Sequence, residues 1–337
     1  MILVTGGTGL VGAHLLYKLV SSNNKVRAIY RNKEKLNNVI SIFSYYTEDY
    51  KSLFNAIEWV KADLLNIPEL TEAFLGITKV YHCAAFVSFE PNKYQLLRQT
   101  NIEGTANIVN FCIASNVEKL CHVSSIATLG TPIKNNPINE EANWNTDADN
   151  NIYAITKYGA EMEVWRATQE GLNAIIVNPG VILGPGIWDH GTGELFKKAK
   201  KGIKHYPSGI VGLIDVNDVT TIMIKLMESN HIINERFVLV AENWTYKNFL
   251  QTLSESVKIS PPQKLASPWL LSIGWKTDWL IHKLTGKRRL LTKHLAESLS
   301  SKKLYDSSKI KTTLSYTFKP IKPTILAIGN HYLNKHI

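Results

Sequence analysis

A glycine-rich loop near the N-terminus constrains the fold of this chain more than any other feature. The loop joins an apolar run at 2–4, typical of a buried strand, to a helical pattern at 10–20. Gly6, Gly9 and Gly12 give the spacing G-x-x-G-x-x-G. In such a loop the first glycine permits a tight turn, the second lets the backbone approach a pyrophosphate, and the third lets the helix pack closely on the strand. Because a helix N-terminus presents free N–H groups to phosphates, the loop predicts a dinucleotide site.

The end of the second predicted strand, at 25–30, indicates which dinucleotide is bound. A site for NAD usually carries an acidic residue at this point, which accepts hydrogen bonds from the ribose 2′-hydroxyl. This chain has Arg31 there instead, with Lys33 and Lys35 just beyond it. A guanidinium pairs with a 2′-phosphate through its charge and its bidentate geometry. The sequence therefore favours NADP(H); NAD(H) is the alternative, with Arg31 then a solvated residue at the end of a strand.

Strand-like and helical segments alternate through the first half of the chain, as in a parallel sheet covered by helices. The predicted strands lie at 2–4, 25–30, 57–61, 79–85, 120–124 and 174–178, and the predicted helices at 10–20, 70–75, 102–114 and 153–169. Glycine, proline and tryptophan accumulate at 180–212, which predicts irregular structure over a pocket. The last third looks mainly helical, with a strand at 236–240. We expect a dinucleotide-binding domain at 1–180, completed by about 210–230, and a smaller substrate-binding or lid domain from 181–209 and 231–337.

The amino-acid composition limits which binding partners and which cellular compartment can be expected. The chain has 38 Lys and Arg against 28 Asp and Glu, a formal net charge of +10, but these residues are spread out without a DNA- or RNA-binding pattern. We interpret them as a solvated basic surface, with attraction of a phosphorylated cofactor as the alternative, and we expect no nucleic acid partner. No apolar run reaches the roughly 18 residues of a membrane span, and no leader precedes the first strand, which predicts a cytoplasmic protein without a membrane partner. Cys83, Cys112 and Cys121 are expected to be free thiols in apolar segments.

A tyrosine and a lysine four residues apart are the candidates for proton chemistry. Tyr153 and Lys157 would lie one turn apart on the same face of a helix. A free phenol titrates near ~10, and a neighbouring ammonium and a positive nicotinamide ring would both lower that pKa. Ser125 closes the fifth predicted strand, where its hydroxyl would hold a substrate oxygen against Tyr153 or would simply cap a turn.

Taken together, these motifs resemble the extended short-chain dehydrogenases/reductases. The matching segments follow the family's order: the loop at 5–12, Asp63-Leu64, Ala84-Ala85, 101–105, Ser124-Ser125, 153–157, 178–180, 184–186 and 215–219. The resemblance covers roughly residues 1 to 225. It implies an α/β fold with a Rossmann-like doubly wound parallel sheet of about seven strands, a smaller and mainly helical C-terminal substrate domain, and a homodimer formed through the helices at 102–114 and 153–169.

The resemblance also implies a role for individual residues. Tyr153 would be the general acid and base, Lys157 would bind the nicotinamide ribose, Ser125 would orient the substrate oxygen, and Asn101 would belong to the supporting polar network. Asp215 and Asp218 are expected to be structural. The residues expected to bind the cofactor are Gly6, Thr8, Gly9, Leu10, Gly12, Arg31, Asp63, Leu64, Ala84, Ala85, Tyr153, Lys157 and Pro179, and those expected to bind substrate are Phe86, Ser125 and Trp188.

Within the family, the chain looks similar to the reductases that resemble dihydroflavonol 4-reductase and 3β-hydroxysteroid dehydrogenase. The resemblance implies interconversion of an aldehyde or ketone and its alcohol, with hydride transfer at nicotinamide C4. Some side chains of the expected pocket suit an apolar or ring-containing carbonyl compound, or are plain core residues: Phe86, Phe89, Trp144, Trp188, His190 and Phe196. The alternatives are a nucleotide-sugar epimerase or dehydratase with tightly bound NAD, and a non-catalytic dinucleotide-sensing protein.

Overall fold

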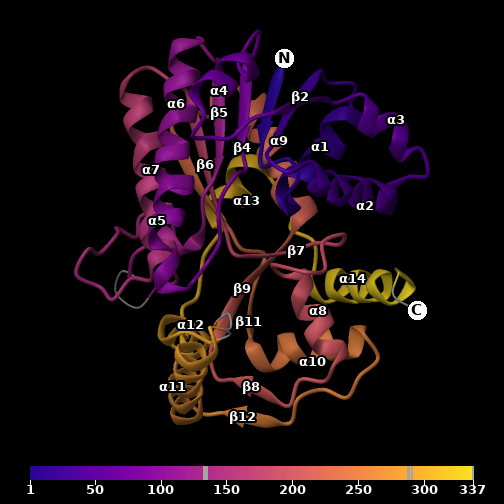
Figure 1. Cartoon of the computed structure of the whole chain (residues 1–337), viewed down its shortest axis with the longest axis vertical. Coiled ribbons are helices and arrows are strands. Elements are labelled where there is room, and N and C mark those ends of the chain that lie inside the picture. Colours follow the sequence, from indigo (N-terminus) through magenta and orange to yellow (C-terminus); the bar gives the residue numbers. More distant parts are fainter. Residues whose placement is uncertain (132–135, 287–288, 290, 336–337) are drawn as a thin grey trace.

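Seven parallel strands form the centre of the molecule (Figure 1), in a computed structural model that describes residues 1–131, 136–286, 289 and 291–335. Their order across the sheet is β10-β6-β5-β4-β1-β2-β3. The strands are β1 (Ile2–Thr5), β2 (Val26–Tyr30), β3 (Glu58–Lys61), β4 (Lys79–His82), β5 (Lys119–Val123), β6 (Ala174–Pro179) and β10 (Glu235–Leu239). The order reverses between β1 and β4, which opens a crevice outside the carboxyl ends of the strands. The predicted α/β class and the sheet of about seven strands are confirmed.

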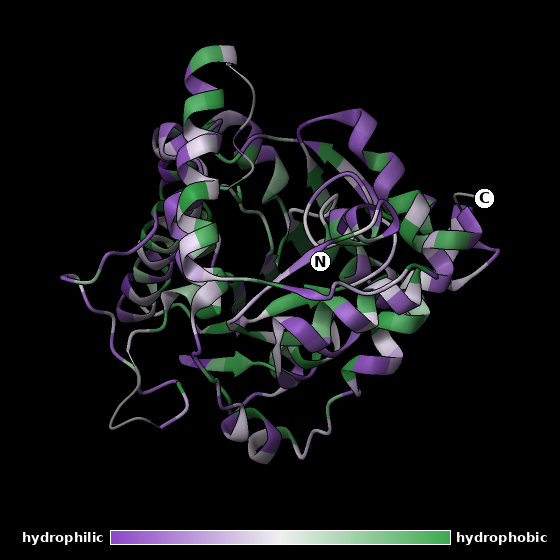
Figure 2. Ribbon diagram, turned by 90° about the horizontal axis from the view of Figure 1, so that it is seen from below, coloured by the Kyte–Doolittle hydropathy of each residue, from purple (hydrophilic) through white to green (hydrophobic). Residues whose placement is uncertain are grey.

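Apolar side chains on successive residues of the central strands, such as β6, pack on opposite faces of the sheet. In β6, Ile175 and Val177 join the core on one face and Ile176 joins the core on the other. A parallel sheet must be covered on both faces, and this explains why its strands read as continuous apolar runs in the sequence. Figure 2 shows the hydrophobic segments concentrated along these central strands.

Helices cover both faces of the sheet (Figure 1). One layer consists of α1 (Leu10–Ser21), α2 (Leu36–Tyr46), α3 (Tyr50–Asn55) and α9 (Val216–Glu228). The other consists of α4 (Ile67–Ala73), α5 (Tyr94–Leu97), α6 (Gly104–Ala114) and α7 (Ile152–Gln169), and α13 (Ser308–Leu314) packs beside β10. This is the doubly wound arrangement that positions a ligand at the strand ends.

A smaller lobe lies below the carboxyl ends of the strands in Figure 1. It contains a three-stranded sheet of β7 (Val181–Leu183), β9 (Ile210–Asp215) and β11 (Glu242–Thr245), and a pair formed by β8 (His205–Pro207) and β12 (Lys264–Ala266). Its helices are α8 (Gly193–Lys200), α10 (Tyr246–Ser256), α11 (Pro268–Thr285), α12 (Lys293–Ser300) and α14 (Ile321–Lys335). The boundaries expected for the two domains stay a prediction.

The structure differs from the expectation in several places, and the last third also contains two unpredicted strands, β11 and β12. The segment at 180–212, expected to be irregular, contains β7, α8 and β8. β7 pairs with β9, some thirty residues later in the chain, and a local pattern does not reveal such a partner. Two helices, α2 and α3, lie between β2 and β3, where no element was predicted. The strand predicted to reach residue 85 ends at His82, which is paired with Thr5, the last residue of neighbouring β1.

Other features bear on the class of protein. All three cysteines, each among the described residues, are free thiols as expected. Within the described ranges, no helix is both long enough and apolar enough to cross a bilayer. Asp215 caps α9 and accepts a hydrogen bond from Thr324, while Asp218 accepts from Tyr316 and from the Lys319 backbone. These two aspartates tie α9 to the C-terminal segment, the structural role expected of them.

Candidate active site

The glycine loop forms a cradle between β1 and α1. A Cβ atom on Gly6, whose φ is +67°, would lie 2.5 Å from the Ala84 nitrogen. A Cβ on Gly12 would lie 2.3 Å from the Gly6 carbonyl oxygen. Both contacts are with backbone, so no side chain fits at either position. Gly9 is the N-cap of α1 and provides no side-chain cap, so the N–H groups of the first helical turn remain available to an anion. The cradle therefore fits a pyrophosphate.

Arg31 and Asp63 face each other at the ends of β2 and β3. The distance from Arg31 Nη1 to Asp63 Oδ2 is 3.5 Å, and both side chains are exposed. The other carboxylate oxygen of Asp63 accepts the Leu65 N–H, which holds the acid in its loop. Since parallel strands end at one edge, this guanidinium lies on the same edge as the glycine cradle. An exposed guanidinium in a weak ion pair is free to bind a phosphate instead.

Tyr153 lies in the first turn of α7, close to the end of β5. Asn151 caps this helix by accepting the Ala154 N–H at 2.8 Å. The phenol packs edge-on against Phe89, with ring centroids 5.6 Å apart. Burial raises the pKa of Tyr153, and a hydrogen bond with the Ser125 side chain lowers it by less. The lowering expected from Lys157 is not found, and the phenol keeps its proton at neutral pH.

Lys157 lies one turn further along α7, and its ammonium is buried at the end of β5. Its Nζ donates to the Val123 carbonyl at 2.8 Å and lies 3.4 Å from His122 Nε2. Burial lowers its pKa to about 8, although Glu161 acts in the opposite direction. The Val123 carbonyl, rather than Tyr153, therefore holds the ammonium next to Ser124 and Ser125. Its lowered pKa of about 8 lies close to physiological pH.

Asn101 connects the loop after β4 to α7. It lies in a π-helical segment at 98–103 that leads into α6. Its side chain accepts the Phe86 N–H at 2.8 Å and donates to the Phe86 carbonyl at 3.0 Å. It also donates to Thr156 Oγ1, between the candidate tyrosine and lysine. Asn101 therefore fixes the backbone of Phe86 relative to the first turns of α7, a positioning role.

A buried carboxylate, Glu161, continues the face of α7 that carries Tyr153 and Lys157. Its side chain is 0% exposed and forms an ion pair with Arg236 of β10, with 3.2 Å between Nη1 and Oε1. Glu161 Oε2 also accepts hydrogen bonds from Ser124, Thr128 and Asn178, at 2.7, 2.8 and 3.0 Å.

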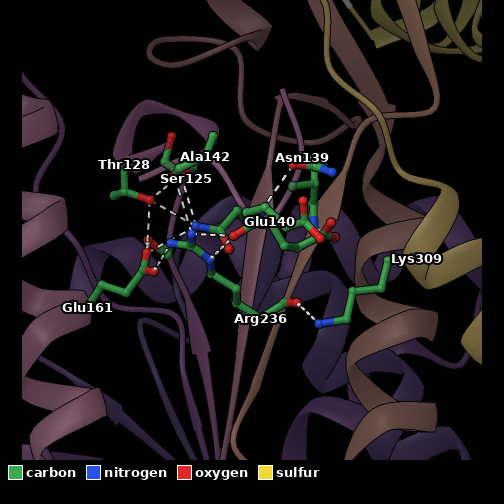
Figure 3. Close-up of polar contacts among 12 residues, drawn as sticks. Ser125, Thr128, Asn139, Glu140, Ala142, Glu161, Arg236 and Lys309 are labelled. Atoms are coloured by element: carbon green, nitrogen blue, oxygen red, sulfur yellow. Dashed lines mark hydrogen bonds and ion pairs between the residues drawn. The ribbon is translucent and has the colours of Figure 1, made fainter. Parts of the chain in front are cut away.

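Arg236 lies in turn against the loop that follows the candidate serine. It donates to the carbonyl oxygens of Glu140 and Ala142 (Figure 3). The ion pair therefore ties α7, the end of β5 and the last strand of the sheet into one rigid unit. Ser124 thus donates its hydroxyl to this unit. Ser125 Oγ accepts the Ala127 N–H at 3.1 Å and caps the turn at 126–128, the alternative expected for it, while its O–H can still donate to a ligand.

Two buried histidines lie behind the candidate site. His82 bridges the Thr5 and Thr105 hydroxyls, at 2.6 and 2.9 Å, and its ring stacks on His122 with centroids 5.1 Å apart. Burial lowers the pKa of His82 to about 3 and that of His122 well below its ordinary value. Both rings are therefore neutral, and they connect the glycine strand to the lysine without adding charge.

Trp188 lies apart from this cluster of candidate residues. Its ring packs against Phe196 and Tyr332 in the core of the smaller lobe, with centroid distances of 6.1 and 5.1 Å. Phe196 is fully buried in the same core. These contacts assign a packing role to Trp188, and its binding to substrate stays a prediction.

Comparison with known proteins identifies the family. A family model described as the NAD dependent epimerase/dehydratase family matches residues 2–240. The chain belongs to this NAD-dependent epimerase/dehydratase family. The match covers all seven strands of the central sheet and the whole cluster around Tyr153.

Proteins similar to this epimerase/dehydratase-family enzyme in sequence or in fold include reductases and an epimerase. A putative dihydroflavonol 4-reductase of Synechocystis is 27% identical over 343 residues, covering 99% of this chain and 94% of that protein. The yeast methylglyoxal/isovaleraldehyde reductase Gre2, solved with NADPH, has a TM-score of 0.74 at 20% identity and covers 99% and 98% of the two chains. A UDP-glucose 4-epimerase of Thermotoga maritima has a TM-score of 0.76 at 18% identity and covers 100% and 99%. The chain is an NAD(P)-dependent oxidoreductase of the extended short-chain type.

The sequence of this family member predicted the candidate catalytic residues, but not the buried ion pair that supports them. The structure brings together the predicted Ser125, Tyr153, Lys157 and Asn101. Sequence reasoning missed Glu161 and Arg236. For Glu161 a signal existed, because it follows Lys157 by four residues and so lies on the same helical face. Arg236 gave no such signal, since only the pairing of β10 with β6 brings it to α7.

Proposed function

We propose that the enzyme interconverts an aldehyde or ketone and its alcohol with NADP(H), with Tyr153 as the general acid and base. The observation that carries this proposal is that the Tyr153 phenol lies beside the Ser125 side chain at the carboxyl edge of the sheet, with Lys157 one turn away. A reductase of aldehydes and a putative dihydroflavonol 4-reductase among the similar proteins support a carbonyl substrate.

The chain's own groups divide the proton chemistry. When bound, the nicotinamide supplies a hydride from C4 to the carbonyl carbon in reduction and accepts it in oxidation. Ser125 donates a hydrogen bond to the carbonyl oxygen and so orients it. As the C=O π bond breaks, Tyr153 transfers its proton to that oxygen, and the phenolate is then reprotonated from solvent. The raised pKa of Tyr153 supports the reductive direction, because the phenol is protonated at neutral pH.

The residues around these groups would bind the two ligands. The glycine cradle would hold the pyrophosphate, Arg31 the 2′-phosphate and Lys157 the nicotinamide ribose. Phe86 and Phe89 lie on the loop after β4, and Phe89 touches the Tyr153 ring. These aromatic side chains support an apolar or ring-containing substrate. A homodimer through α6 and α7 remains part of the proposal.

The test of cofactor choice is a fluorescence titration of the wild-type protein and Arg31→Ala with NADPH and NADH. Loss of a charge-assisted bond of about 1.5–3 kcal/mol should weaken NADPH binding about 10- to 100-fold and leave NADH binding nearly unchanged. Arg98→Ala is the matched control, because Arg98 is also an exposed arginine in an ion pair, with Glu103. A wild-type preference for NADH, or NAD retained on purification, would reject NADP(H) and favour the epimerase alternative.

Cofactor affinity should fall as the pH rises through about 8. The pKa of Lys157 is lowered to about 8, so above that pH the free protein loses the proton that the ribose contact uses. The dissociation constant for NADPH should then rise by up to about tenfold per pH unit. Destabilisation of the fold does not explain such a loss of affinity. The pKa of Lys157 is lower in the folded protein than in the unfolded chain, so raising the pH from about 8 toward the ordinary lysine pKa favours the folded state. Lys157→Met should bind NADPH weakly at pH 7, and its dissociation constant should not change near pH 8. If the variant showed the same change in affinity as wild type, the titrating group would be a residue other than Lys157.

A further inference from the structure

Helix α11 carries its apolar side chains on the outside of the protein. Within this fully described helix no residue is buried. Trp269 and Leu284 are 73% and 76% exposed. The other large apolar side chains exposed on it are Leu270, Ile273, Trp279, Leu280 and Ile281. Solvated helices normally turn such residues inward, so an outward apolar helix marks an interaction surface.

Most of these side chains share one face of the helix. At about 100° per residue, Trp269, Ile273, Leu280 and Leu284 fall within about 60° of one another. Leu270 and Ile281 extend the apolar face to about 120°. The helix's one acidic residue points the other way, where Asp278 Oδ2 pairs with Arg289 Nε at 3.2 Å in a largely buried contact. The outward face therefore carries no negative charge.

Two lysines border the apolar face. The same helical geometry places Lys276 and Lys283 along one edge of it. Their ammonium groups lie 5.8 Å from the centre of the Trp275 ring and 5.3 Å from that of Trp279. Between these aromatic side chains is an apolar hollow of about 450 Å³, lined by Trp275, Lys276, Trp279 and Leu280. An apolar face with tryptophans and lysines at its border is complementary to anionic headgroups above acyl chains.

The position of α11 leaves this face accessible. Figure 1 places α11 and α12 at the end of the smaller lobe, away from the central sheet. Its large apolar side chains are exposed from one end of the helix to the other, from Trp269 to Leu284. A flat surface can therefore reach the helix without touching the cofactor cradle.

We propose that α11 is an interfacial helix that docks the enzyme on an anionic lipid bilayer. The face of Trp269, Ile273, Leu280 and Leu284 enters the headgroup boundary, and the bordering lysines bind lipid phosphates. The net charge of +10 adds long-range attraction. If two copies of the chain associated through this face, their lysines would lie close together and repel one another. Anionic lipid headgroups would instead neutralise these lysines. The absence of a spanning segment in the sequence, which predicted no membrane partner, does not bear on a helix that lies in the interface.

Flotation of the full-length protein with vesicles tests this proposal without any turnover measurement. Wild type should bind vesicles of phosphatidylcholine with phosphatidylglycerol, and bind pure phosphatidylcholine about tenfold or more weakly. The double variant Leu280→Glu/Leu284→Glu should lose at least about tenfold in binding, since it puts charge into the apolar boundary. The control is Leu75→Glu, because Leu75 is 59% exposed elsewhere on the chain. Both leucines of the double variant are exposed, so circular dichroism should report an intact fold.

Two results would overturn the proposal: wild-type protein that binds neither vesicle, and a double variant that binds as well as wild type. If the first occurs and the double variant also dissociates a lipid-free dimer, the face belongs to a second copy of the chain. Lys276→Glu/Lys283→Glu adds a further check: it should abolish the preference for anionic vesicles, and an unchanged preference would count against the lysine contacts.

Discussion

Replacing Tyr153 by phenylalanine should lower kcat for carbonyl reduction by about 10²–10⁴-fold, the usual contribution of a positioned general acid. The ring would still pack edge-on against Phe89, so the fold and the cofactor cradle should be unaffected. NADPH binding, followed by fluorescence, should therefore stay within about twofold of wild type, because the lost interaction acts on the transition state. Turnover would be measured with a panel of aldehydes and ketones.

A neighbouring tyrosine provides the control. Tyr158 lies on the same helix and stacks on Trp144, with ring centroids 4.5 Å apart, and it takes no part in the contacts with Ser125. Tyr158→Phe should retain turnover. If Tyr153→Phe retained it as well, the proton would come from another group and the general-acid assignment would be wrong. A wild-type protein that binds NADPH but reduces no carbonyl would favour the dinucleotide-sensing alternative.

The second large effect is expected on stability. Glu161→Ala should lower the free energy of unfolding by about 3–5 kcal/mol, because it leaves the Arg236 guanidinium largely buried without its counter-charge. It also removes the acceptor for Ser124, Thr128 and Asn178. Glu161→Gln keeps an acceptor oxygen in place and should cost less, about 1–3 kcal/mol. Chemical denaturation followed by circular dichroism would measure both variants.

A partly exposed glutamate on the same helix, Glu163, is the matched control. Glu163 pairs with Arg166 at 2.9 Å in a solvated contact, and such pairs contribute about 0–1 kcal/mol. Glu163→Ala should therefore change stability little. An equal loss in the two alanine variants would mean that the general helix propensity of α7, and not the buried ion pair, determines the result. Reversal of charge at Arg236 together with Glu161 would be unsuitable as a test, since Arg236 also binds backbone carbonyls.

Local sequence patterns predicted those parts of the protein that depend on a short motif. The cradle at 5–12 is recognisable because glycine is needed where a Cβ would meet backbone, as at Gly6 and Gly12. Tyr153 and Lys157 are recognisable because four-residue spacing places them on one helical face. The same reasoning was less successful past Pro179. There β7 acquires its partner β9 through a long-range pairing, and the segment's glycines and prolines resemble a loop.

The sequence by itself determined the class of fold, the cofactor loop and the identity of the residues at the ends of β5 and α7, because each depends on spacing within a few residues. Only the tertiary structure decided the environment of those residues. Burial raises the pKa of Tyr153 and lowers that of Lys157, and the pairing of β10 with β6 delivers Arg236 to Glu161. The tertiary structure alone also turned the apolar face of α11 outward. Desolvation, long-range pairing and exposure depend on which distant segments pack together, and no local pattern carries that information.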